Sequence, residues 1–107
     1  MQENSKGLTT GTARLRFVVG HKAAGGHFPG NPIIPGAVLL RDIVAAVAGD
    51  GDRCRDIRSV KFHHPVRPGN TLVVSWTEDP TGEVRFSCSI EGSTDAAVTG
   101  GFRLAPH

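Results

Sequence analysis

The segment from Ala37 to Gly49, AVLLRDIVAAVAG, constrains the fold of this chain more than any other segment does. Its apolar residues nearly surround a helix, and only Arg41 and Asp42 interrupt them. A helix that is apolar on almost all sides is typically buried. Pro35 before the segment and Gly49 at its end match the usual preference for proline at the start and glycine at the end of a helix. We therefore expect one buried helix that the rest of the chain covers.

Most of the remaining chain alternates between apolar and polar residues, which is typical of half-buried strands. The pattern begins at 13–19 and returns in the segments 57–64, 71–77, 84–90 and 96–104, with turns at Pro68–Gly69 and Asp79–Gly82. The order of strand, loop, helix and four antiparallel strands predicts an α+β domain with a sheet wrapped around the helix. Such a sheet leaves its edges exposed, so we expect a dimer.

The length of 107 residues fits one domain with one modest core. We expect residues 1–10 to be a flexible tail and residues 11–107 to form a single domain. No apolar run is long enough to span a membrane, and the polar N-terminus does not resemble a signal peptide. The cytoplasm is therefore the expected location, without contact with a membrane.

The charges do not point to a nucleic acid as the partner. The formal charge is only +2, and the densest basic stretch, 53–61, is mixed with acidic residues: Asp50 and Asp52 directly before it and Asp56 within it. A nucleic-acid-binding chain carries a cleaner basic stripe with exposed aromatic residues. Cys54 and Cys88 are not in a metal-like spacing, so we expect two reduced thiols and no metal site.

The segment from Gly20 to Pro35 is too rich in glycine and proline for regular structure, and it contains His27. Long loops of this kind in small domains are often functional. A helix N-terminus offers free N–H groups, and Gly36 has no side chain to keep a ligand oxygen away from its own N–H. An imidazole beside such a donor suits the abstraction of a proton next to a carbonyl. The alternative is that His27 only stabilises the loop by a hydrogen bond.

The residues from His27 to Gly36, HFPGNPIIPG, resemble the HFPGxPxxPG signature of the FabA/FabZ-type β-hydroxyacyl-ACP dehydratases. The segments 60–62 and 65–70 resemble the KFxxPVxPGD motif of the same family, and the weaker similarity extends from about Ala13 to Leu104. The short length is similar to that of the small ApeI-like members. The resemblance implies a hot-dog fold, in which an antiparallel sheet wraps around one central helix.

The resemblance also implies an activity in fatty acid or related acyl or polyene biosynthesis. His27 would take the α-proton of a β-hydroxyacyl thioester on acyl carrier protein, and the Gly36 N–H would hold the thioester oxygen. An acid on the central helix of the other protomer would help the hydroxyl to leave as water. Phe28, Pro35, Ala37 and Arg41 would bind the substrate. The implied assembly is a homodimer or a dimer of related chains, and no metal or cofactor is needed.

One position departs from the family pattern. The acid of these dehydratases lies fourteen residues after the histidine, and here that residue is Arg41. Arginine does not give up its proton near neutral pH. Asp42 is the nearest carboxylate, but one residue along a helix turns it by about 100°. Asp42 is therefore a candidate catalytic acid only with an altered geometry.

Four interpretations stay open. Asp42 substitutes for the acid, or a related partner chain supplies it. Alternatively, the chain has lost the activity and binds acyl thioesters or a partner subunit. In the fourth, His27 works with water or another residue, as a slower dehydratase or a hot-dog thioesterase. His63 and His64 are adjacent on a strand, so one is expected to point inward and one outward in a mainly structural role.

Overall fold

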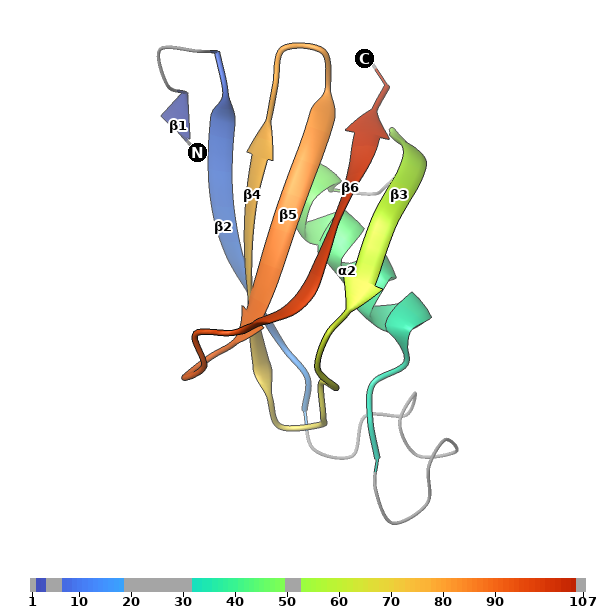
Figure 1. The fold of residues 1–107 in the computed structure, drawn as a ribbon, viewed down its shortest axis with the longest axis vertical. Coiled ribbons are helices and arrows are strands. Elements are labelled where there is room, and N and C mark those ends of the chain that lie inside the picture. Colours follow the sequence, from blue (N-terminus) through green and yellow to red (C-terminus); the bar gives the residue numbers. More distant parts are fainter. Residues whose placement is uncertain (1, 4–6, 19–31, 50–52, 106–107) are drawn as a thin grey trace.

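The computed structural model describes residues 2–3, 7–18, 32–49 and 53–105. One helix and six strands lie in these segments (Figure 1). In chain order they are β1 (Gln2–Glu3), β2 (Thr9–Arg16), α2 (Gly36–Ala48), β3 (Cys54–Phe62), β4 (Thr71–Glu78), β5 (Glu83–Ile90) and β6 (Ala96–Leu104). The α+β class predicted from the sequence is confirmed.

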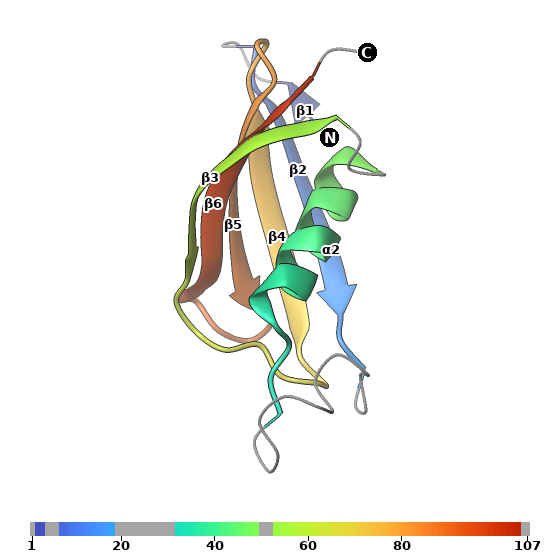
Figure 2. The same ribbon diagram turned by 90° about the vertical axis from the view of Figure 1, so that its right-hand side faces the viewer.

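The strands form one antiparallel sheet in the order β1-β2-β4-β5-β6-β3, and α2 lies against one face of it (Figure 2). The alternation within the strands explains which face the helix covers. On β4 and β5, every second residue is buried, from Leu72 to Trp76 and from Val84 to Cys88. The helix contributes Leu39, Ile43 and Val44 to the same core. Burial of these apolar side chains on one face of the sheet holds the two layers together.

Strand β3 does not pair with its successor along the chain. It pairs with β6 and forms an edge of the sheet. Strands β4, β5 and β6 are connected as hairpins, and β2 takes the free side of β4, so the free side of β6 is left for β3. The register of β3 shifts twice, and Asp56 and Ser59 have left-handed backbone conformations with φ of 51° and 57°. These two bulges increase the local twist of this edge.

The helix differs from the expectation of burial on almost all sides. Leu39, Ile43 and Val44 are buried, but Ala37, Arg41 and Ala45 are exposed. These three exposed residues are spaced four apart, so they share a stripe on the side of α2 away from the sheet. The apolar composition of the helix therefore exceeds what the sheet of one chain covers.

The segment expected as a tail contains part of the sheet, because Gln2 and Glu3 pair with Thr10 and Thr9. The division into a tail at 1–10 and a domain at 11–107 stays a prediction. Both predicted turns are present: Asn70 N–H donates to the Arg67 carbonyl, and Gly82 has a φ of 90° in the β4–β5 turn. No helix in the described segments has the length and apolarity that crossing a membrane requires.

Candidate functional site

Both ends of the predicted active-site loop are anchored to the same short segment, 66–70. Before the loop, the Phe17 N–H donates to the Asn70 carbonyl at 3.0 Å. Near the end of the loop, the Ile34 N–H donates to the Val66 carbonyl at 2.7 Å. Phe17, Ile34 and Val66 are all buried in the core. His27 and Phe28 lie outside the described residues, so their predicted roles stay predictions.

Helix α2 begins at Gly36, directly after Pro35. Pro35 has the extended backbone of an N-cap residue, with φ of −59° and ψ of 145°, and its carbonyl accepts the N–H groups of Val38 and Leu39 at 3.0 and 3.1 Å. No side chain caps this end, and its first turn contains no acidic residue. The N–H groups at the very start of a helix have no partner within the helix and carry a partial positive charge. The predicted oxygen-binding role of Gly36 is compatible with this position.

The ring of Phe62 stands directly beside Gly36. A Cβ atom on Gly36 would lie 2.9 Å from Phe62 Cζ and 3.2 Å from both Cε atoms. Phe62 is 49% exposed. The reason is that β3 is an edge strand, so its end is not covered by another strand. Only glycine fits at position 36 without moving this ring.

A hollow of about 200 Å³ adjoins Gly36 and Phe62. Its walls are mainly apolar and include Ile33, Leu39 and Val66. The helix start, whose first N–H groups have no partner within the helix, therefore borders an apolar space. Such an arrangement can hold a polar carbonyl at the helix end and an apolar chain beside it.

Arg41 and Asp42 were predicted as site residues from the sequence, and the structure places both on the accessible side of α2. The Arg41 side chain is 69% exposed and that of Asp42 is 32% exposed. Arg41 Nε donates to Asp42 Oδ1 at 3.2 Å, as a local ion pair. Ala37, a predicted substrate-binding residue, is exposed one helical turn before Arg41. Arg41 and Ala37 thus lie on the side of α2 away from the sheet of their own chain.

The two adjacent histidines are both exposed rather than divided between an inner and an outer face. Their N–H groups both donate to the Ala97 carbonyl, at 2.7 Å for His63 and 3.3 Å for His64. Two successive N–H groups can share one carbonyl because β3 has already ended at Phe62. The His63 ring lies 2.9 Å from Thr99 Oγ1. Both histidines also border the hollow beside Gly36.

Sequence reasoning missed Phe62 as a residue of the site. The sequence feature that pointed to Phe62 was the Lys61–Phe62 pair, which matches the start of the KFxxPVxPGD motif. The sequence alone does not place that pair against the start of the helix. In the described part of the chain, no three His, Cys, Asp or Glu side chains gather as metal ligands would.

Comparison with known proteins places these features in a family. The family model described as ApeI-like, "ApeI dehydratase", matches residues 2–101. A 3-hydroxyacyl-[acyl-carrier-protein] dehydratase FabZ of Thermomicrobium roseum is 46% identical over 85 residues, which are 70% of this chain and 54% of that protein. FabZ of Latilactobacillus sakei subsp. sakei is 35% identical over 94 residues, or 75% of this chain and 67% of that protein. The chain thus spans little more than half the length of some curated relatives.

The fold is shared with solved structures as well. The dehydratase heterocomplex ApeI:P from Xenorhabdus doucetiae matches with a TM-score of 0.73 and 24% identity, over 91% of this chain and 88% of that one. This similarity shows the same sheet and central helix. The family match covers the start of α2, Phe62 and all of β4 and β5. The chain is therefore a member of the ApeI-like dehydratase family, within the FabA/FabZ-type group, and has the hot-dog fold.

Proposed function

We propose that this chain is a dehydratase-type subunit that converts β-hydroxyacyl thioesters, presented on acyl carrier protein, into enoyl thioesters. The observation that carries the proposal is the start of α2. The N–H of Gly36, at the start of the helix, borders an apolar hollow, and the His27 motif precedes it in the sequence. The family match and the FabZ relatives support the same substrate class.

In this reaction His27 accepts the α-proton of the substrate. The electrons of the broken C–H bond form the double bond between the α and β carbons, and the β-hydroxyl leaves with a proton as water. While the proton is removed, negative charge develops on the thioester oxygen. The N–H of Gly36 stabilises that charge, because a fixed donor at a helix start needs no rearrangement. The hollow beside Phe62 keeps water away from part of the substrate.

The proton for the leaving hydroxyl requires a carboxylic acid that Arg41 does not provide. Asp42 is one candidate, and in the single chain its Oδ1 lies 3.2 Å from Arg41 Nε. The exposed stripe Ala37, Arg41, Ala45 favours a second candidate function, in which this chain is one subunit of a mixed dimer. A related partner then contributes the acid from its own helix to the site of this chain. The similar ApeI:P structure is described as a heterocomplex, which agrees with this assignment.

The free edge of β3 supports pairing with a second chain. Among the described strands β3 borders only β6, and its residues Ile57 and Phe62 are 48% and 49% exposed. An exposed strand edge with apolar side chains is a template for another strand. Because Phe62 also lies beside Gly36, a chain that pairs here would approach the proposed site. A soluble dimer or mixed dimer in the cytoplasm completes the proposal.

The test follows enoyl absorbance and free thiol together while the purified chain acts on a β-hydroxyacyl thioester, carried on acyl carrier protein in one arm and on coenzyme A in another. We expect an enoyl product without free thiol, with a higher kcat/KM in the carrier arm. His27→Ala should abolish the product, whereas the matched change His107→Ala should not. If the chain alone is inactive, the same assay is repeated after co-expression with a homologue that has Asp or Glu at the position of Arg41. Release of thiol without enoyl would instead identify a thioesterase.

A further inference from the structure

A cleft of about 340 Å³ lies on the face of the sheet opposite α2, and the proposed reaction does not use it. Val84, Phe86 and Phe102 are buried under the helix. Since neighbouring residues of a strand point to opposite faces, the residues between them face outward. These are Glu83 and Arg85 on β5 and Gly101 on β6, and all three line the cleft.

The pairing of the strands explains why the face is hollow here. Gly101 pairs with Arg85 on one side and with Arg58 on the other. Arg85 and Arg58 lie two strands apart, so the distance between their backbones is twice the spacing of adjacent strands, roughly 10 Å. Gly101, on the strand between them, has no side chain to fill this gap. In the next outward row, Thr99 pairs with Ser87 and with Lys61. The site is therefore a gap above Gly101, and its lining includes two guanidinium groups, one ammonium group, one carboxylate and the hydroxyl residues Ser59 and Thr99.

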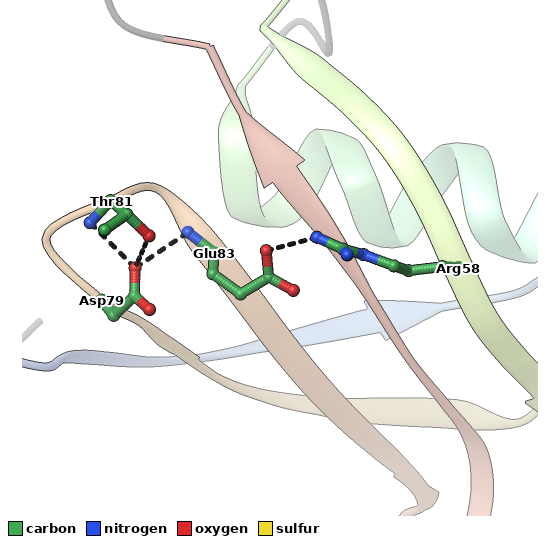
Figure 3. Close-up of polar contacts among 4 residues, drawn as sticks. All are labelled: Arg58, Asp79, Thr81 and Glu83. Carbon is green, nitrogen blue, oxygen red and sulfur yellow. Dashed lines mark hydrogen bonds and ion pairs between the residues drawn. The ribbon is translucent and has the colours of Figure 1, made fainter.

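The charges of this cleft are not balanced. Its lining contains the cations Arg58, Lys61 and Arg85 and one carboxylate, Glu83. Glu83 Oε2 is paired with Arg58 Nη2 at 2.5 Å (Figure 3). No carboxylate of the described residues forms an ion pair with Lys61 or Arg85. The net charge of the lining is three minus one, or +2, which equals the formal charge of the whole chain.

We propose that this cleft binds a phosphate-type dianion, either free phosphate or a phosphate group of a larger ligand. A dianion matches the net charge of +2, whereas a carboxylate would duplicate the group that Glu83 already presents. Arg58 has five N–H donors, and its Nη2 donates to Glu83, so other N–H groups of the same guanidinium remain for a ligand. The planar guanidinium of Arg85 can donate two parallel hydrogen bonds to one phosphate group. The Thr99 hydroxyl, 2.9 Å from the His63 ring, lies beside the same gap.

Isothermal titration calorimetry at constant ionic strength tests this site, with inorganic phosphate in one arm and glycerol 3-phosphate in the other. Arg85→Gln should weaken binding about fivefold, the upper end for one exposed charge pair. Glu83→Gln removes the only carboxylate of the lining and should tighten binding about threefold. Arg16→Gln is the matched control, since Arg16 is exposed on the same face of β2 but outside the cleft. Circular dichroism confirms that each variant is folded.

Tighter binding of inorganic phosphate supports a free anion as the ligand, and tighter binding of the ester supports a phosphate carried by a larger molecule. The proposal is overturned if Arg85→Gln and Arg16→Gln weaken binding equally, because the effect then reflects total charge only. It is also overturned if acetate binds as tightly as phosphate. A third contrary result is no heat of binding at phosphate concentrations up to about 10 mM, tenfold above a weak Kd of about 1 mM. None of these outcomes depends on dehydratase activity.

Discussion

Arg58 on β3 and Glu83 on β5 form an ion pair, with Nη2 and Oε2 2.5 Å apart, although strand β6 lies between their strands (Figure 3). The contact is diagonal, since Arg58 pairs with Gly101 and Glu83 with Arg103. Arg58 lies between the two left-handed residues of the bulged edge, Asp56 and Ser59. The pair therefore connects the irregular part of β3 to the regular centre of the sheet.

Loss of this ion pair should loosen the edge strand more than the whole fold. The two side chains are 53% and 27% exposed, so we expect Arg58→Gln to lower the free energy of unfolding by only about 0.5 kcal/mol. Amide hydrogen exchange should become faster in β3 while β4 and β5 keep their protection. A double-mutant cycle with Glu83→Gln measures the coupling, and a coupling energy of zero would show that the contact does not stabilise the edge.

Gly36→Ala tests the close approach of Phe62 to the start of α2. The new Cβ would lie 2.9 Å from the ring, so the ring must move into the hollow or toward solvent. Because Phe62 is half exposed, we expect a change in unfolding free energy below about 1 kcal/mol, offset in part by the helix preference of alanine. The rate of enoyl formation by Gly36→Ala should fall at least about tenfold, because the N–H of residue 36 would no longer be open to the thioester oxygen. In Gly36→Ala/Phe62→Ala the strain is relieved, so stability should recover; recovery of activity as well would show that the glycine is needed only for the ring.

Asp79 should stabilise the β4–β5 turn only while it is ionised. Its Oδ1 accepts the N–H groups of Thr81 and Glu83 and the Thr81 hydroxyl, at 2.9, 3.0 and 2.6 Å (Figure 3). The Thr81 hydroxyl, followed by the Glu83 N–H, holds the pKa of this carboxyl below its usual value. A lowered pKa in the folded state means that the stabilisation is present above the unfolded pKa and is lost as the pH falls through the folded pKa. Asp79→Ala should therefore lower the Tm at pH 7, and the difference from wild type should shrink toward pH 2.

Cys88 should make the protein less stable in alkaline solution. Burial raises the pKa of its thiol from 9.0 to about 12. Because the pKa is raised in the folded state, the contribution of this thiol to the free energy of unfolding is complete below the pKa of the unfolded state. It is lost as the pH rises through the pKa of the folded state. Urea unfolding from pH 8 to pH 10.5 should show a steeper loss of stability for wild type than for Cys88→Ala. Parallel slopes for the two proteins would contradict the assignment. Cys54, half-buried with its pKa raised mainly by burial, is the second thiol and stays in both proteins.

The sequence predicted the parts of the fold that depend on local patterns. The alternation on β4 and β5, the glycine turn before Glu83 and the helix after Pro35 are all as expected, because each follows from neighbouring residues. The position of β3 beside β6 could not be predicted in this way, since strand order depends on which edges are free. Its two bulges fall at Asp56 and Ser59, where no glycine marks a left-handed conformation.

In the candidate site, too, the sequence predicted the local features but not the contacts between distant elements. Gly36 was predicted at the helix start, and its role rested on the absence of a side chain. Phe62 could not be assigned to it, because the contact joins residues 26 positions apart across two elements. The composition of α2 suggested burial on all sides, but the sheet of one chain covers only part of it, which leaves Arg41 exposed.

Installing the missing acid tests the central claim most directly. Arg41→Glu places a carboxyl group at the position where the family has its acid, on the exposed stripe of α2. The initial rate of enoyl formation from a β-hydroxyacyl thioester should rise about 100-fold over the chain alone, the lower range for one general acid. Adding His27→Ala to this variant should remove the gain. If a folded Arg41→Glu protein forms no more enoyl product than wild type, or if the gain survives without His27, the proposed site is wrong.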